Sequence, residues 1–520
     1  MDFLIKLLFL VLFFGVMLFV GFYCRRHATD VNGFVLGGRN VGPWLTAFAY
    51  GTSYFSAVVF VGYAGQFGWK YGIAATWVGI ANALLGSLLA WSVLGRRTRV
   101  MTQHLGTATM PQFFEKRFQS RALKIASSAI IFIFLIPYTA SLYNGLSRLF
   151  AMAFDIDYAV CVIVMAVLTG IYVIAGGYMA TAINDFIQGI IMIGGIIAVV
   201  AAVLRGQGGF LSALDSLARV QDASVSETPG IFASFFGPDP LNLLGVMILT
   251  SLGTWGLPQM VQKFYAIKSE NAISKGTIIS TLFATLVAGG CYFLGGFGRL
   301  FAARVDIAAE GYDAIVPAML SDLPAVLIAV VVVLVLSASM STLSSLVLTS
   351  SSTLTLDFLK DLRKKEMSEK SQLLIMRLLI VVFILISVVL AIVQYQSGLT
   401  FIAQLMGISW GTLAGAFLAP FLYGLYWKRT TSAACWTSFL FSVGVMLADI
   451  LAPSAFPAIL RSPINAGAFC MLAGLILVPV VSLLTKSPEK TFVNETFACY
   501  DRKIVVSVRD SIGDEVPEKE

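Results

Sequence analysis

The feature of this sequence best suited to binding chemistry is a run of hydroxyl-bearing residues inside a strongly apolar region. It spans residues 335–357 and reads VLSASMSTLSSLVLTSSSTLTLD, and the adjoining residues 325–336 are almost wholly aliphatic. The segment therefore predicts a membrane helix that turns polar on one face halfway along. Because residues three and four apart are neighbours on a helix, that face contains Ala338, Ser341, Thr342, Ser345, Thr349 and Ser352.

This polar face offers hydroxyl and carbonyl oxygens but no fixed charge. A compact, uncharged cluster of oxygens suits a hard monovalent cation, whereas divalent oxygen sites usually recruit several carboxylates. The alternative is structural: Ser and Thr in membrane helices bond back to the preceding turn or join neighbouring helices. The spacing alone is compatible with both interpretations.

The composition sets the class of protein. Of 520 residues, 58% are hydrophobic and only 12% are charged, too few to cover a soluble globule of this size. We expect a polytopic protein of the lipid bilayer. Its formal charge of +7 comes from basic residues that concentrate in particular loops, where they determine which side of the membrane each loop faces. Nucleic acid is not an expected partner. Two histidines and six scattered cysteines give little material for a metal site, a disulfide framework or a catalytic group, so we expect no enzyme activity.

Thirteen apolar stretches approach or exceed the roughly 20 residues that cross a bilayer. They are residues 3–23, 43–66, 73–94, 123–150, 158–175, 183–204, 241–261, 278–301, 325–354, 373–393, 399–425, 433–451 and 466–484. The first ends in Cys24-Arg25-Arg26 and not in a small-residue cleavage site. We therefore interpret it as a membrane helix and not as a signal peptide.

The charges between these stretches predict the topology. Basic residues fill the first, third and ninth loops: Arg25, Arg26 and Arg39, then Arg96, Arg97, Arg99, Lys116, Arg117 and Arg121, then Lys360, Arg363, Lys364, Lys365 and Lys370. The even loops carry mainly acidic residues, among them Asp155, Asp222, Asp239 and Asp313. By the positive-inside rule we expect a multi-pass protein of the cell membrane with its N-terminus outside and its C-terminus in the cytoplasm.

Two segments outside this count of spans also carry expectations. The longest outside loop, residues 205–240, contains a short amphipathic piece near 210–220 and is expected to cap the extracellular mouth. After a transmembrane domain of residues 1–485, the polar stretch 486–520 is expected to be a partly disordered cytoplasmic tail.

Two of the apolar stretches are interrupted at mid-membrane depth. Residues 49–56 read AYGTSYFS and residues 250–259 read TSLGTWGLPQ. Irregular backbone at that depth is tolerated where it lines a cavity, and paired interruptions indicate an inverted-repeat transporter. The spacing predicts repeats over about 43–204 and 241–425. For either interruption alone, a Gly-rich helix packed closely on its neighbours is the alternative.

The sequence resembles the sodium/solute symporters, which include the sodium/glucose cotransporters and the bacterial sodium/proline symporter. The resemblance rests on FVLGGR at 34–39 followed by Gly42-Pro43-Trp44, on AGG at 175–177 followed by NDFIQ at 184–188, and on the run at 338–345. It covers nearly the whole chain. It implies an all-α, leucine-transporter-type fold with broken first helices in each repeat, and co-transport of sodium with a small organic solute.

The resemblance also implies particular ligands. The main sodium site would comprise the backbone carbonyls of Thr52, Phe55 and Ala338 with the hydroxyls of Ser341 and Thr342. A second sodium site, present in some relatives, would comprise Asp185, Ser344 and Ser345. An acidic residue within a membrane span is a functional hypothesis by default, but Asp185 follows a Gly-Gly turn and is alternatively the cap of the sixth helix.

The expected solute pocket lies between the two interruptions. Its residues are Ser53, Tyr54, Ser56, Tyr138, Trp255 and Gln259, and they include no arginine or lysine. Tyr138 matches a tyrosine tied to substrate in the proline symporter, whereas Tyr54 stands where that protein has an aspartate, and Thr250 and Thr254 align with its pocket aromatics.

These features favour a sodium-coupled symporter that imports an amino acid such as proline, or a monocarboxylate, by alternating access. The alternatives are a sodium-coupled sugar or polyol transporter and a transporter-like sensor without transport. The tail is too short for a kinase domain. An oxygen-lined channel is a further class, but the paired interruptions favour occlusion.

Overall fold

The computed structural model describes residues 2–154, 156–360, 367–397 and 402–501. These residues form helices joined by short connections, with no β-strand among them. Four charged residues of the predicted loops, Asp155, Arg363, Lys364 and Lys365, lie outside the described residues, as do the first residues of the expected span 399–425 and the tail beyond 501.

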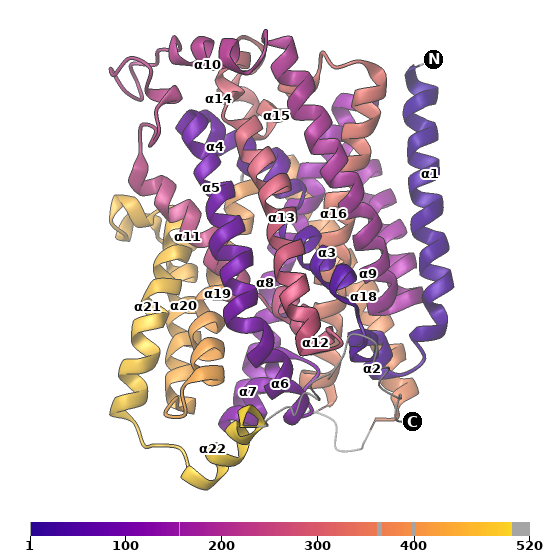
Figure 1. The fold of residues 1–520 in the computed structure, drawn as a ribbon, viewed down its shortest axis with the longest axis vertical. Helices are drawn as coiled ribbons and strands as arrows, with labels where there is room; N and C mark the ends of the chain where they lie inside the picture. Colours follow the sequence, from indigo (N-terminus) through magenta and orange to yellow (C-terminus); the bar gives the residue numbers. More distant parts are fainter. Residues whose placement is uncertain (1, 155, 361–366, 398–401, 502–520) are drawn as a thin grey trace, which may run out of the picture.

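The longer helices form a bundle (Figure 1). They are α1 (Asp2–Tyr23), α3 (Pro43–Tyr54), α8 (Arg121–Phe154), α9 (Tyr158–Gly206), α11 (Pro240–Gly256), α12 (Pro258–Ala266), α13 (Glu270–Gly295), α16 (Ala325–Thr353), α18 (Glu369–Ser397), α19 (Ile402–Tyr426), α20 (Ser432–Leu451) and α21 (Pro463–Leu484). Wider π-helical turns, which often mark functional sites, occur at η3 (Val58–Tyr63), η5 (Asn82–Leu89), η6 (Trp91–Gly95) and η10 (Leu354–Leu359).

Shorter helices lie at the two ends of this bundle or, like α4 (Ala64–Tyr71) and α5 (Thr76–Ala81), continue its long segments. They are α2 (Val31–Leu36), α4 (Ala64–Tyr71), α5 (Thr76–Ala81), α6 (Arg96–His104), α7 (Met110–Phe118), α10 (Phe210–Ala218), α14 (Ile307–Glu310), α15 (Ile315–Leu320) and α22 (Lys490–Phe497). The start of α1 lies at the same end as α10 and α14, and α6, α7 and α22 lie at the other (Figure 1). The amphipathic piece expected near 210–220 is α10, so that prediction is confirmed.

Ten helices among the described residues are long and apolar enough to cross a membrane, or eleven if the bent pair α11 and α12 is one span. Two of the ten, Val58–His104 and Tyr158–Gly206, are 47 and 49 residues long. Each is about twice the length that one crossing needs. The second kinks at Gly177, whose φ of 55° breaks the helical geometry. The expected stretches 158–175 and 183–204 both lie within it.

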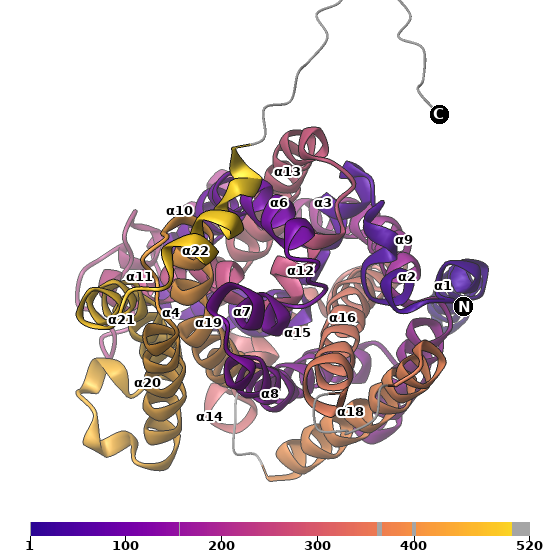
Figure 2. The ribbon, with the colours of Figure 1, turned by 90° about the horizontal axis from the view of Figure 1, so that it is seen from below.

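The hydroxyl-rich helix lies at the centre of the bundle. Within Ala325–Leu359, 78% of the most apolar stretch is buried, against 22% within Phe3–Arg26. Viewed from below, α12 and α16 lie inside a ring of other helices, while α1, α20 and α21 lie at the rim (Figure 2). Because α16 packs on α8, α9, α18 and α3, its polar face meets protein and not lipid.

Both predicted interruptions are confirmed, and they have different local causes. In the second, Pro258 begins α12, and proline drives the preceding residue out of the helical region; Leu257 is extended (φ −76°, ψ 123°) and the two helices meet at 45°. In the first, α3 ends at Tyr54 and Phe55 is extended (φ −102°, ψ 94°), with no proline nearby to impose the break. Packing against other helices therefore sets the first break.

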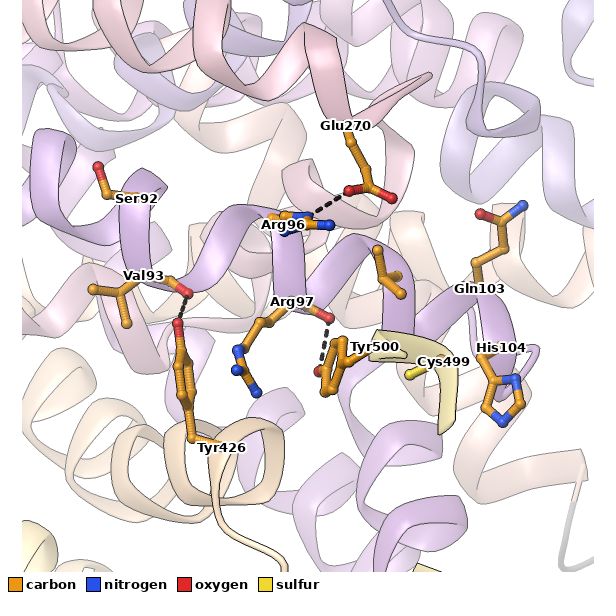
Figure 3. A pocket seen from close by; sticks show the side chains of 11 residues that line it. Ser92, Val93, Arg96, Arg97, Gln103, His104, Glu270, Tyr426, Cys499 and Tyr500 are labelled. Carbon is orange, nitrogen blue, oxygen red and sulfur yellow. Dashed lines mark hydrogen bonds and ion pairs between the residues drawn. The ribbon is translucent and has the colours of Figure 1, made fainter. Parts of the chain in front are cut away.

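The chain after α21 returns to the bundle. Residues 486–520 were expected to form a partly disordered tail, but α22 and the 3-10 turn η13 (Ala498–Tyr500) within them pack against α6. The Arg97 guanidinium lies 4.0 Å from the ring centre of Tyr426 and 4.6 Å from that of Tyr500. Figure 3 shows these side chains around a cavity of about 630 Å³, with Arg96 paired to Glu270. Residues 486–501 thus close over this end of the bundle.

Candidate ion and solute site

Four of the five oxygens expected to form the main sodium site converge where α3 ends against α16. Ser341 Oγ lies 3.1 Å from the Thr52 carbonyl oxygen and 3.3 Å from that of Ala338. Thr342 Oγ1 lies 3.2 Å from the Thr52 oxygen and 3.1 Å from that of Ala338. The cluster joins two helices 286 positions apart in sequence, counted from Thr52 to Ala338.

Local structure explains why these oxygens are available. Thr52 lies in the last turn of α3, where carbonyls have no helical amide to accept from. Ser341 and Thr342 bond back to their own helix, as the structural alternative expected, and also reach across to α3. The side chains of Thr52, Ser341 and Thr342 are completely buried. Phe55 lies at the break, but no hydrogen bond among the described residues ties its carbonyl to the cluster.

The residues expected to form a second sodium site surround a lysine that the sequence analysis missed. Lys263 Nζ donates to Ser345 Oγ at 2.9 Å and lies 3.9 Å from a carboxylate oxygen of Asp185. Ser345 Oγ also shares a 2.9 Å hydrogen bond with Ser53 Oγ. Ser344 Oγ instead donates to the Ser341 carbonyl of its own helix. Two of the residues expected to form the second sodium site therefore already face a positive charge, the Lys263 ammonium.

Asp185 does not cap a helix. It lies eight residues beyond the kink at Gly177, inside the second half of α9, and is fully buried. Neither of its carboxylate oxygens has a hydrogen-bond partner among the described residues. The capping alternative is wrong because a cap would lie at the kink and accept a backbone N–H there.

Aromatic side chains gather beside the main oxygen cluster. The ring of Tyr54 stacks on Trp410 at 6.0 Å, and Tyr138 meets Trp410 edge-on at 5.8 Å. The Tyr54 hydroxyl donates to the Thr250 carbonyl at 2.6 Å and so connects the two broken helices. Trp410, on α19, was not among the expected pocket residues. Trp410, Tyr54 and Tyr138 together form an aromatic surface that suits a small apolar ring or chain.

Several buried polar atoms of the expected pocket residues and of Trp410 have no hydrogen-bond partner among the described residues. They are Ser56 Oγ, the Tyr138 hydroxyl, Trp410 Nε1 and both amide atoms of Gln259. Buried polar groups are almost always hydrogen-bonded, so such a set is typical of a place where a polar ligand binds. Trp255 differs, because its Nε1 donates to the Leu85 carbonyl at 3.0 Å, which directs the indole towards η5.

The sequence carried a signal for one of the two residues that were not predicted, Lys263, and none for the other, Trp410. The seventh apolar stretch was taken to end at residue 261, so Lys263 fell just outside it, whereas α12 continues to Ala266. Extending that stretch by one turn would have exposed a lysine within a membrane span, which is a functional hypothesis by default. Trp410 gave no such signal, because a tryptophan within an uninterrupted apolar stretch is usually core.

Sequence comparisons agree with this geometry. The model of the sodium:solute symporter family matches residues 34–440. The osmoregulated proline transporter OpuE of Bacillus subtilis is 28% identical over 483 residues, which cover 92% of this chain and 94% of that protein. The sodium/proline symporter of Staphylococcus aureus is 29% identical over 497 residues, covering 92% of each chain.

A solved structure has the same fold. It is the substrate-bound, outward-open state of a Na⁺-coupled sialic acid symporter, with a TM-score of 0.70 at 18% sequence identity. The match covers 94% of this chain and 99% of that one.

Proposed function

The chain belongs to the sodium:solute symporter family, and from this premise we propose that it imports a small amino acid such as proline, or a monocarboxylate, by alternating access. It is a multi-pass membrane protein that couples sodium to the transport of a small organic solute. Sodium and the solute are its cargo. The proposal concerns the identity of the solute, the residues that bind it and the route across the membrane.

One observation carries the sodium part of the proposal: the hydroxyls of Ser341 and Thr342 each lie 3.1–3.3 Å from two carbonyl oxygens, those of Thr52 and Ala338. These donors are hard, neutral oxygens, which suit a monovalent cation. A half-helix end supplies one carbonyl, as in other broken-helix ion sites. Sodium bound here would hold the broken end of α3 against α16.

Burial of the site supports alternating access. The proposed sodium and solute residues have side chains no more than 7% exposed, Trp255 being the most exposed of them. Neither cargo can therefore reach the site until surrounding helices move. An enclosed central site that opens to each side in turn is typical of a symporter, whereas a channel has a site that stays continuously open.

The solute class is inferred from the pocket and from the relatives. Tyr54, Tyr138 and Trp410 offer flat apolar faces, while Ser56 and Gln259 carry unpaired polar atoms. A small solute with an apolar ring or chain and a polar head fits both features. Two relatives are named as proline transporters. Sugars and polyols are less favoured because each of their many hydroxyl groups needs a hydrogen-bond partner in a buried site.

We also propose thirteen crossings with the N-terminus outside. If the two helical segments of 47 and 49 residues each cross twice and the bent pair crosses once, the ten spans become thirteen. The two ends of the described chain lie at opposite ends of the bundle, which requires an odd number (Figure 1). Repeats over 43–204 and 241–425 would each begin with a broken helix. An impermeant maleimide should label Ser216→Cys from outside and Ser487→Cys only from the cytoplasm.

The solute is tested by uptake into proteoliposomes. Labelled proline, other amino acids, short monocarboxylates and sugars are offered under an inward sodium gradient and, as the control, under the same potassium gradient. We expect concentrative uptake of proline or another small amino acid with sodium alone. Selective uptake of a sugar would contradict the solute assignment, and equal uptake in both salts would contradict sodium coupling. Uptake of nothing in the panel would favour the sensor alternative.

A further inference from the structure

A buried ammonium occupies the position expected for a second sodium ion. The Lys263 side chain is 3% exposed and that of Asp185 is fully buried. Lys263 Nζ contacts Ser345 Oγ at 2.9 Å, faces Asp185 at 3.9 Å and lies 5.3 Å from the ring centre of Tyr178. Two of the three residues expected to bind a second sodium, Asp185 and Ser345, therefore already face a monovalent cation.

The charge balance permits one cation at this place. Asp185 is the sole acidic group within 4.0 Å of Lys263 among the described residues. A sodium ion on Asp185 and Ser345 would sit within a few ångströms of the ammonium, and one carboxylate would then face two buried positive charges. Buried charges that lack a partner are strongly unfavourable. The arrangement of this chain thus does not fit the second sodium site that the family resemblance implied.

We propose that Lys263 is a tethered cation that replaces the second sodium, so that the protein binds one sodium ion per transport cycle. This inference rests on the proposed function, because it presumes that the main site binds sodium. The main site differs in having four neutral oxygens and no side-chain charge among them. Its cation must come from solution, whereas the second cation is part of the chain.

A short hydrogen-bonded path connects the two cations. Lys263 donates to Ser345, Ser345 shares a hydrogen bond with Ser53, and Ser53 adjoins Thr52, whose carbonyl belongs to the main cluster. The ammonium therefore helps to fix the end of α3 at the main site. Since α12 carries Lys263 and α3 carries Ser53, the path also joins the second broken helix to the first.

The test counts sodium ions on the purified full-length protein in detergent with ²²Na⁺, a probe that requires no knowledge of the solute. We expect the parent protein to saturate at one sodium with a Hill coefficient near one. Lys263→Ala leaves Asp185 and Ser345 without their cation, so it should bind two sodium ions at saturation. Lys263→Arg keeps the charge and should bind one.

The double variant Lys263→Ala/Asp185→Asn removes both charges and should return to one sodium ion. Two sodium ions on the parent protein would overturn the inference, as would one ion on a folded Lys263→Ala variant. If Lys263→Ala does not fold, the counts for the parent and for Lys263→Arg still decide, since two ions on either would refute it. No saturable sodium on the parent would instead contradict the proposed sodium site.

Discussion

The hydroxyl groups of Ser341 and Thr342 are the side-chain part of the main oxygen cluster, so removing either should weaken sodium binding. A hydrogen bond or contact to a charged group contributes about 1.5–3 kcal/mol, and every 1.4 kcal/mol is tenfold in affinity. Ser341→Ala and Thr342→Ala should each raise the half-saturating sodium concentration for uptake by about 10- to 100-fold, measured at saturating solute.

Ser339 provides the matched control for that measurement. It lies on the same helix and is nearly fully buried, but its hydroxyl donates only to the Val335 carbonyl of its own helix, at 2.8 Å. Ser339→Ala should therefore leave the half-saturating sodium concentration unchanged. An equal effect of all three substitutions would mean that loss of helix packing, and not loss of a ligand, changes the sodium response.

At this scale the sequence predicted ligands whose type and spacing repeat along a helix. Ser341 and Thr342 were found because hydroxyls three and four residues apart share a face. Trp410 was not found, because its importance depends on which distant helices it faces. Lys263 was missed because the predicted stretch ended at residue 261, and nothing near it in the sequence indicates that it faces Asp185, 78 positions earlier in the chain. No local pattern records that proximity.

The close approach of α4 and α13 is the packing feature on which the first broken helix depends. A Cβ at Gly68 would clash with the carbonyl oxygen of Gly295, and a Cβ at Gly295 would clash with that of Ala64. Both clashes are with backbone, which cannot rotate away. Because α4 continues the broken helix beyond η3, this contact holds its outer half in place.

Gly68→Ala should therefore destabilise the protein strongly. Overpacking typically costs about 1–3 kcal/mol, and a backbone clash belongs at or above the top of that range. We expect a lower midpoint temperature of unfolding in detergent, or loss of the folded protein from the membrane. Gly289→Ala on α13 is the control: a Cβ there has nothing within 4 Å, and alanine favours a helix over glycine by about 1 kcal/mol. Similar losses in both variants would contradict the argument.

Helix breaks differ in how well a sequence predicts them. The break at Leu257 was predicted only within residues 250–259, although Pro258, which imposes it, marks the residue in the sequence. The break at Phe55 could be placed only within an eight-residue stretch of small and hydroxyl residues, since tertiary contacts fix its position. Hydropathy also separates 158–175 from 183–204, and these stretches correspond to the two arms of α9, which meet at Gly177, where φ of 55° and ψ of −147° interrupt the helix.

Across the whole molecule, one arginine ties the loop of residues 205–240 to the end of the first broken span. Arg299, in η8 (Gly298–Arg304), donates to the Trp69 carbonyl at 2.7 Å and to Asp222 at 2.9 Å. Its guanidinium also lies 3.7 Å from the ring centre of Phe232. These contacts hold residues 222–232 over the end of α4, so the loop expected to cap the mouth is tied to a helix that leads to the sodium site.

The contacts that hold the cap, residues 222–232, should weaken in acid. A hydrogen bond from Ser224 and one from Arg299 lower the pKa of Asp222 below its ordinary value, near 3.9. A carboxyl group with a depressed pKa stabilises its contacts above that ordinary value and loses them as the pH falls through the folded-state pKa. Asp222→Asn should mimic acid at neutral pH, with faster amide hydrogen exchange over residues 222–232 and no further acceleration below about pH 4 after correction for intrinsic rates.

Asp215→Asn distinguishes the cap from a general effect of charge in the loop. Asp215 pairs with Arg219 on α10, but both side chains are more than half exposed, and such surface pairs contribute little. Amide exchange over residues 222–232 should stay at the parent rate in this variant.

If sodium binding at the main site closes the end of the molecule where this loop lies, saturating sodium should slow amide exchange of residues 222–232 in the parent but not in Ser341→Ala at the same concentration. An equal response in both would mean that the cap and the sodium site move independently.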